Sequence, residues 1–130
     1  MPQQRIIVYG SADPGDPAEL SGNNTYTGTN TFGWLATAAS TKTSASSPYT
    51  AASNDFLIRC DATSASISIL LKSATGTGRL LSIKKIDSGS CAVVISACGT
   101  DTIDGESSQT ISAYENLLIQ DAATGVWDIV

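Results

Sequence analysis

The chain has 130 residues, a formal net charge of -5 and an apolar fraction of 42%, which suit one ordinary domain with a modest hydrophobic core. The excess of acidic residues would repel a phosphate backbone, so we expect no nucleic-acid partner. Apolar stretches are far shorter than the about 20 residues that span a bilayer, and no signal-peptide apolar region follows the first residues, so we expect synthesis in a cytosol and no membrane partner.

The first predicted element is a short strand near the N-terminus. Its β-branched and aromatic residues are Ile6, Ile7, Val8 and Tyr9. Residues 11–54 follow with few charged side chains and no helical periodicity, being mostly Ser, Thr, Ala, Gly, Asn and Pro. A compact domain rarely contains so long a stretch without structure. We therefore assign residues 1–54 to an anchor strand and an extended arm, which is either disordered or ordered by something outside its own subunit.

Within this arm, residues 24–34 alternate in character with a period of two. An extended chain would place Tyr26, Phe32 and Trp34 on one side and a row of Thr residues on the other. One strand cannot bury three aromatic rings alone, so the pattern needs a partner surface. That surface is the chain's own domain, a sister subunit or a host particle.

Residues 55–130 carry regular strand signals separated by turn residues. We expect strands over residues 55–61, 66–71, 79–86, 91–96, 110–113, 116–120 and 126–130. This spacing predicts an all-β fold, with a small antiparallel β-sandwich or barrel as the C-terminal domain. Ile103 and Trp127 are expected in its core, Cys60 and Cys91 as small buried hydrophobes, and Cys98 in a partly exposed turn.

The sequence lacks the usual chemistry of a catalytic site. It has no histidine, which removes the commonest general base and the commonest metal ligand, and no serine stands in a G-x-S-x-G elbow. The Gly76-Thr77-Gly78 run precedes a strand rather than a helix, which favours a turn over a phosphate-binding loop. We therefore expect no enzymatic activity, no catalytic residue and no cofactor.

Two groups of side chains have alternative interpretations. Asp101, Asp104 and Glu106 could hold Ca²⁺, but their spacing is not that of an EF-hand loop and turn formation explains them equally well, so we expect no metal site. Tyr49, Tyr114 and Trp127 are candidate sugar contacts, although the alternating strand around Trp127 favours a core position.

Several motifs resemble bacteriophage fibre and head-decoration proteins. The first is NTYTGTNTF at residues 24–32. The others are RLLSIKKID at 79–87, AVVI at 92–95, DTIDG at 101–105 and VWDI at 126–129. Their order is similar to that of the small β tip domains that end many phage fibres. The resemblance covers residues 24–34 and 55–130 and indicates a virion setting rather than a particular ligand.

The resemblance implies a homotrimer with a shared N-terminal stem, in which Tyr26, Phe32 and Trp34 would find their partners. It also implies a structural protein on the capsid surface, a cement protein or head fibre. Our hypothesis is that such a protein would bind the phage major capsid protein through the predicted strand at residues 6–9. The alternative is a tail-fibre or receptor-binding tip that adheres to a host-surface glycan. The arm could span at most about 150 Å even if fully extended, which is short for a tail fibre and favours capsid decoration.

Overall fold

The computed structural model describes residues 39–130, which form ten short strands and contain no α-helix. The strands are β1 (Ala39–Thr43), β2 (Tyr49–Thr50), β3 (Leu57–Asp61), β4 (Ile67–Leu70), β5 (Leu80–Lys85), β6 (Val93–Ser96), β7 (Thr102–Ile103), β8 (Ser108–Ile111), β9 (Asn116–Ala123) and β10 (Val126–Ile129). One 3-10 turn, η1 (Ser44–Ser46), follows β1. No helix in this part of the chain is long and apolar enough to cross a bilayer.

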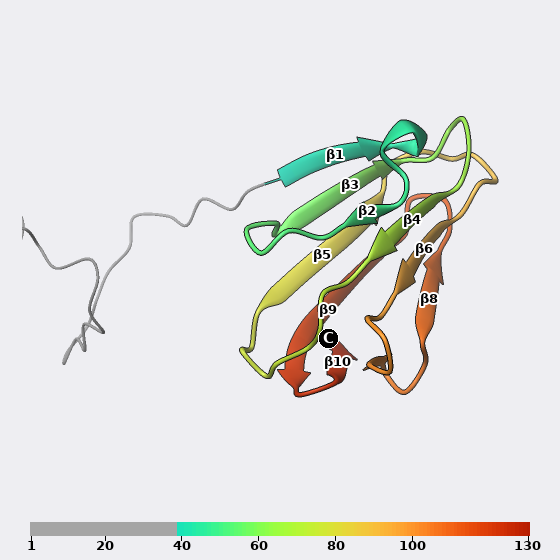
Figure 1. The fold of residues 1–130 in the computed structure, drawn as a ribbon. Helices are drawn as coiled ribbons and strands as arrows, with labels where there is room; N and C mark the ends of the chain where they lie inside the picture. The colour runs from blue at the N-terminus through green and yellow to red at the C-terminus, as the bar shows by residue number, and fades with distance from the viewer. Residues whose placement is uncertain (1–38) are drawn as a thin grey trace, which may run out of the picture. The chain divides into compact units, whose positions relative to one another are not determined.

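The described chain winds between two sheets and forms a β-solenoid of about three turns (Figure 1). One sheet has six strands in the order β1-β3-β5-β9-β10-β7, and the other has four in the order β2-β4-β6-β8. Each of the first three turns contributes one strand to each sheet. Strands of successive turns pair in parallel, so that β1, β3 and β5 line up in one sheet and β2, β4 and β6 in the other.

After β6 the pairing changes from parallel to antiparallel. β8 pairs antiparallel with β6, and β9 pairs antiparallel with β5. β9 and β10 form a hairpin, and β7 pairs in parallel with β10 at the edge of the six-stranded sheet. The last turn of the solenoid is therefore followed by a layer of different topology, as in repeat proteins whose terminal unit is atypical.

The core consists of inward-facing side chains that stack from one turn to the next. Parallel pairing keeps equivalent residues in line, so aliphatic side chains of neighbouring turns contact one another. The stacked and fully buried pairs are Ile58 with Ile83, Ile67 with Val93, and Ile69 with Ile95. Ile103, Ile119 and Trp127 continue the core beneath the last turn. Each fully buried aliphatic side chain stabilises the fold by roughly 1.5–3 kcal/mol relative to its exposed state.

The first turn differs from the others because polar side chains occupy inward positions on β1 and β2, although Tyr49 packs partly against the core and Ala51 is buried in it. At the register positions where the second turn carries buried apolar side chains, it carries Ser40, Lys42 and Tyr49, all half-buried. Lys42 Nζ lies 3.8 Å from the centre of the Tyr49 ring, a cation–π contact. The Tyr49 hydroxyl donates to Asp55 Oδ2 at 2.8 Å. Within the described residues, this end of the core is therefore covered by polar side chains that satisfy one another.

The predicted all-β class is confirmed, but the predicted antiparallel sandwich or barrel is wrong. Strand and turn signals mark where strands occur without identifying their partners, and here a strand pairs with its equivalent one turn later rather than with its neighbour in sequence. The turns also differ in length, since Ala39 pairs with Leu57 and Leu57 with Ser82. No fixed sequence period therefore reveals the solenoid.

The seven strands predicted after residue 54 overlap with β3, β4, β5, β6, β8, β9 and β10. The structure adds β1 and β2, which lie in the segment assigned to the arm and pair with β3 and β4. It also adds β7, where a turn was predicted. The added strands are short or have polar inward positions, so they lack the alternation of apolar and polar residues that identifies a strand in sequence.

Candidate functional site

The residues predicted to carry the function lie outside the described part of the chain. They are the anchor residues Ile6, Ile7, Val8 and Tyr9 and the stem residues Tyr26, Phe32 and Trp34. Their roles stay predictions. Within residues 39–130, several aspartates accept more than one hydrogen bond. Their carboxylates accept backbone N–H groups at the connections between the two sheets.

Asp121 on β9 is the most enclosed of these aspartates. Its side chain is buried, and its two carboxylate oxygens accept the N–H groups of Thr75, Gly76 and Thr77 at 2.7, 2.7 and 3.2 Å. The hydroxyls of Thr75 and Thr77 also donate to it, at 3.2 and 2.6 Å. The connection between β4 and β5 is therefore wrapped around one carboxylate, which confirms that the glycine-containing run forms a turn.

The pKa of the Asp121 carboxyl depends on its burial and on these hydrogen bonds. Burial by itself would raise the pKa of the carboxyl, because it penalises the charged form. The hydrogen bonds from the Thr77 hydroxyl and from the N–H groups of Gly76, Thr75 and Thr77 outweigh burial and lower the pKa to about 2. Gly76 has a φ of 78°, which glycine adopts without strain, and an added Cβ would lie 3.3 Å from the backbone of Ala123.

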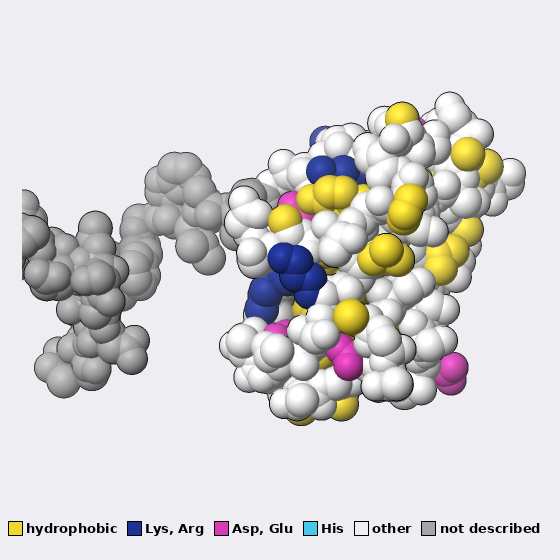
Figure 2. All heavy atoms as spheres, in the orientation of Figure 1, with side chains coloured by type: hydrophobic (Ala, Val, Ile, Leu, Met, Phe, Trp, Pro, Cys, Tyr) yellow, Lys and Arg dark blue, Asp and Glu magenta, His cyan; other side chains and the backbone are white. Residues whose placement is uncertain are grey.

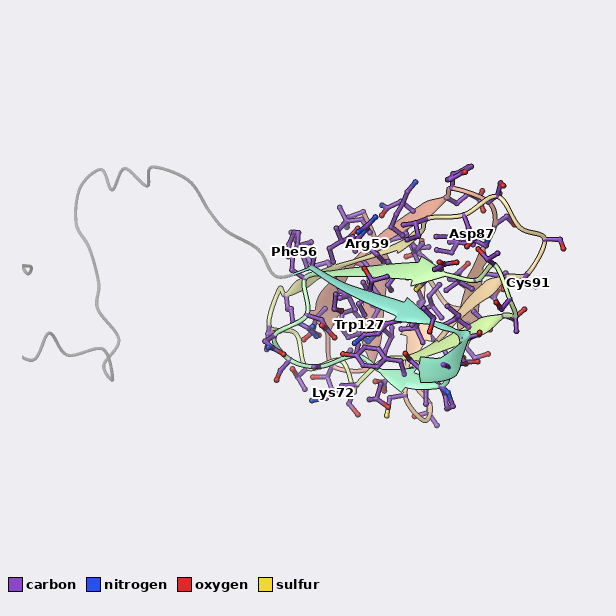
Figure 3. All side chains as sticks on the ribbon, turned by 90° about the horizontal axis from the view of Figure 1, so that it is seen from above. Phe56, Arg59, Lys72, Asp87, Cys91 and Trp127 are labelled. Carbon is purple, nitrogen blue, oxygen red and sulfur yellow. The ribbon has the colours of Figure 1, made fainter. Side chains whose placement is uncertain are left out.

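A second aspartate, Asp87, is labelled in Figure 3. It forms an ion pair with Lys85, the last residue of β5. Lys85 is fully buried, and its Nζ also donates to the carbonyl oxygens of Asp87 and Gly89 at 3.1 and 2.9 Å. Asp87 in turn accepts the N–H of Ala62 at 2.7 Å and that of Gly89 at 2.8 Å. The hydrogen bond from Lys85 is the main cause that lowers the pKa of Asp87, burial opposes it, and the two N–H groups add to it. The contacts of Lys85 and Asp87 therefore join the connection that follows β3 to the connection that follows β5.

Cys60 lies between Lys42 and Lys85 in the register of the six-stranded sheet. Its side chain is fully buried, and burial, followed by the charge of Asp87, raises the pKa of the thiol to about 11, although Lys42 opposes the rise. Cys60 is thus a protonated, apolar core residue, as predicted. Cys91 and Cys98 are half-buried free cysteines, so the prediction of a buried Cys91 is only partly met.

Asp55 closes the loop between β2 and β3. Its carboxylate accepts the hydroxyl of Tyr49 and the N–H of Ala52, both at 2.8 Å, and the hydroxyl of Ser40 at 3.3 Å. Arg79 Nη2 donates to the carbonyl oxygens of Ala52 and Asp55 at 2.7 and 2.8 Å. This loop is thereby joined both to the first turn and to the start of β5.

The cluster of Asp101, Asp104 and Glu106 does not converge on a common point. Asp101 Oδ2 accepts the N–H of Ala74, and Asp104 Oδ1 accepts the N–H of Ile129, each at 2.8 Å. In the described part of the chain no group of three His, Cys, Asp or Glu side chains could hold a metal ion. Asp101 and Asp104 therefore link the segments around β7 to distant parts of the chain.

The three candidate sugar contacts lie in different environments. Trp127 is 2% exposed and packs in the core, as Figure 3 illustrates, so it presents no ring face to a ligand. Tyr49 is half-buried between Lys42 and Asp55. Tyr114, in the connection between β8 and β9, is 58% exposed and has a φ of 59°. Tyr114 is the candidate whose ring is accessible.

Sequence reasoning did not identify the roles of Asp87 and Asp121. Both contact residues more than 20 positions away, and the carboxylate of Asp121 reaches Thr75 across 46 positions. The available signal was an aspartate in or beside an apolar strand, where an unpaired charge is costly.

Comparison with known proteins adds no assignment: no family model, no curated protein and no solved structure matches this chain.

Proposed function

We propose that this chain is a structural, non-catalytic virion protein that decorates a phage capsid. Its N-terminal segment binds the outer face of the major capsid protein, and its β-solenoid domain is displayed outward. The supporting observation is that the core of residues 39–130 is covered at both ends. Polar side chains of Ser40, Lys42 and Tyr49 cover one end, and the layer after β6 covers the other. We assign attachment to the preceding segment, residues 1–38.

The chemistry of the domain supports a structural role. The carboxylates of Asp87 and Asp121 accept backbone N–H groups, so they hold the chain in place instead of facing a substrate. A ladder of parallel strands, each paired with the next turn, is a compact scaffold whose stability depends on neighbouring turns. Such a scaffold suits a protein displayed on a particle.

Attachment is tested with purified capsids and the full-length chain. We expect the wild-type chain to co-sediment with expanded capsids, and the Val8→Asp variant to lose at least roughly tenfold in capsid affinity because a charge replaces an apolar anchor residue. Ser11→Asp adds the same charge beyond the anchor strand and is the matched control. Equal binding by the three chains would refute the anchor.

The homotrimer is the second part of the proposal, with Tyr26, Phe32 and Trp34 as the shared stem. Light scattering coupled to gel filtration measures the mass of the full-length chain and of the Phe32→Ser/Trp34→Ser variant. We expect a trimer for the first and a monomer for the second, since the aromatic rings would have lost their partners. A wild-type monomer at micromolar concentration would rule the stem out.

A second candidate function, adhesion to a host-surface glycan, is favoured by one observation. Tyr114 presents an exposed aromatic ring in a left-handed backbone conformation, a feature that occurs at binding sites. Electron microscopy of virions carrying an antibody to the domain separates the two functions. Label over the head supports decoration, and label confined to the tail supports adhesion.

A further inference from the structure

The four-stranded sheet ends at β8, whose outer side has no strand partner in the described part of the chain. Figure 1 shows β8 as the outermost strand on the right of the domain. An edge strand presents N–H and C=O groups with which another chain can pair, and proteins usually protect such edges with charges, proline, short strands or turns. Whether β8 can act as an interaction surface therefore depends on how it is protected.

The other three edge strands of residues 39–130 are protected. β1 carries Lys42 at an inward position, and β2 is only two residues long and follows Pro48. On β7, the N–H and the carbonyl oxygen of Ile103 are hydrogen-bonded to the backbone of Glu106, at 2.7 and 3.0 Å. β8 has four residues, Ser108–Ile111, with no charge and no proline, in regular register with β6. Of these four edges, β8 is the one that lacks protection.

The hydrogen bonds between β8 and β6 identify the backbone groups of β8 that point outward. The Ala97 N–H donates to the Ser107 carbonyl oxygen at 2.9 Å, so by the alternation of an antiparallel ladder Gln109 is also bonded to β6. The N–H and C=O groups of Ser108 and Thr110 therefore point away from β6. Among the described residues no hydrogen bond engages these groups, and both residues are exposed.

The backbone groups on either side of this stretch are already engaged. The N–H and C=O of Glu106 are bonded to Ile103. The Ser112 N–H donates to the Glu115 carboxylate, and the Ser112 carbonyl oxygen accepts the Glu115 N–H. The accessible edge is thus limited to residues 108–110. It is too short for a long peptide strand, but it matches in length the same stretch of a second copy.

We propose that two copies of this chain associate through β8, which pairs antiparallel with the β8 of the second copy about a two-fold axis at Gln109. Ser108 of each copy then lies opposite Thr110 of the other, and every outward N–H and C=O group of the two residues gains a partner. A register shifted either way would pair one of them with Ser112 or Glu106, whose groups are engaged. The contact uses the same surface on both copies, so it closes after two. It goes beyond the proposed virion function and does not depend on it.

The exposed side chains of β8 suit this pairing. Ser108 and Thr110 lie on the same face of the strand, because they are two positions apart. In the proposed register the hydroxyl of each faces the hydroxyl of the other across the two copies, a kind of cross-strand pair that stabilises antiparallel sheets. The centre of the contact therefore contains no unmatched charge.

The ends of the contact are acidic. Residues 86–130 contain no Lys, Arg or His, and in Figure 2 no dark blue side chain lies on the right of the visible face, where β8 is found. Glu106 would lie opposite Ser112 of the second copy, whose turn carries the exposed Glu115. Repulsion between exposed charges is screened by salt. Association is therefore weak, because the contact is small, and it strengthens as the ionic strength rises.

Sedimentation equilibrium of the full-length Phe32→Ser/Trp34→Ser chain tests the contact without a stem-mediated trimer. We expect mostly one copy at roughly 10 μM and mostly two at roughly 1 mM, with more dimer in about 0.5 M than in about 0.02 M salt. Hydrogen exchange at the two concentrations locates the contact. The amide protons of Ser108 and Thr110 should exchange about fivefold more slowly at the higher concentration, since only the second copy gives them acceptors.

Variants in the same chain test the backbone pairing. Thr110→Pro removes the N–H that donates to Ser108 of the second copy, so it should weaken association at least roughly tenfold. Thr110→Val is the matched control, because it keeps the N–H and favours a strand, and it should associate within about twofold of the parent chain. Glu106→Lys, at an exposed position, should strengthen association about threefold in low salt, because it would meet Glu115 of the second copy.

Urea denaturation establishes that each variant is folded. The proposal is overturned if the chain remains a single copy at roughly 1 mM, if folded Thr110→Pro dimerises as strongly as Thr110→Val, or if the exchange of the Ser108 and Thr110 amides is independent of concentration. If Thr110→Pro does not fold, the exchange rates and Glu106→Lys decide the question. None of these outcomes bears on capsid attachment, which is measured with particles, or on the trimer, which is measured with the aromatic stem intact.

Discussion

Lys85 and Asp87 form an ion pair at the end of β5, although the lysine side chain is fully buried. Asp87 also accepts the N–H of Ala62 from the turn before, so the pair links two turns of the solenoid. Taking a lysine out of water is costly unless its donors are matched, and here the Asp87 and Gly89 carbonyl oxygens complete the set. The pair therefore fixes a corner of the fold.

Removal of the two partners should have unequal effects. Asp87→Ala leaves a buried ammonium group without its counter-charge and two N–H groups without their acceptor, whereas Lys85→Met removes the buried charge and leaves Asp87 with two backbone donors. We expect Asp87→Ala to reduce the free energy of unfolding more than Lys85→Met. Urea denaturation of both variants and of the double variant measures this, and the reverse order would contradict the assigned roles.

Asp121→Asn should destabilise the domain strongly. The asparagine NH₂ group would face N–H donors of residues 75–77 and leave at least one of them without an acceptor. We expect a loss of roughly 3 kcal/mol in the free energy of unfolding, measured by urea denaturation. The exposed Asp128→Asn is the control, with an expected change within about 0.5 kcal/mol. Similar losses in the two variants would exclude the wrapped carboxylate as a stabilising feature.

The same carboxyl predicts a dependence of stability on acid. Because the pKa of Asp121 falls from 3.8 to about 2 on folding, its contribution is fully present above about pH 4 and is lost as the pH falls to about 2. The wild-type midpoint of urea unfolding should decrease over this range. Asp121→Asn should show a smaller decrease, and parallel curves for the two proteins would contradict this assignment.

The three cysteines should react at different rates with iodoacetamide in the native state. Cys60 is fully buried, and a pKa of about 11 instead of 9.0 lowers its thiolate fraction about 100-fold near neutral pH. Cys91 and Cys98 are half-buried and should be alkylated at least about 100-fold faster, as measured by mass spectrometry of peptides. In urea, where the fold is lost, the difference should disappear. Rapid native labelling of Cys60 would show that it is not enclosed.

Tyr114 has a left-handed backbone conformation that an asparagine adopts more readily than a tyrosine. We expect Tyr114→Asn to increase the free energy of unfolding by about 0.5 kcal/mol, because the exposed ring contributes little packing. The same variant should lose adhesion to host cells if the glycan-binding function applies. A variant that is less stable than the wild type would mean that the ring makes contacts that its exposure does not suggest.

The sequence predicted the all-β class and most strand positions because Ile58, Ile83 and Ile119 lie in clear alternating patterns. It did not predict the parallel pairing, since the same alternation serves a strand whichever neighbour it has. β1 was missed because Ser40 and Lys42 occupy its inward positions. The hydrogen bonds of Asp121 were not predicted, because Asp121 and Thr75 are far apart in sequence and come together only in the folded solenoid.

The polar inward side chains of β1 also influence the order in which the domain loses its structure. In a stack of turns each unit is held mainly by its neighbours, so a terminal unit with little apolar surface opens at the lowest energetic cost. Amide protons of β1 and β2 should therefore exchange with solvent first, while those of β5, paired on both sides and flanked by buried Leu81 and Ile83, exchange last. Among the described residues we expect opening to begin at β1, and the remaining turns can persist while that strand opens and closes.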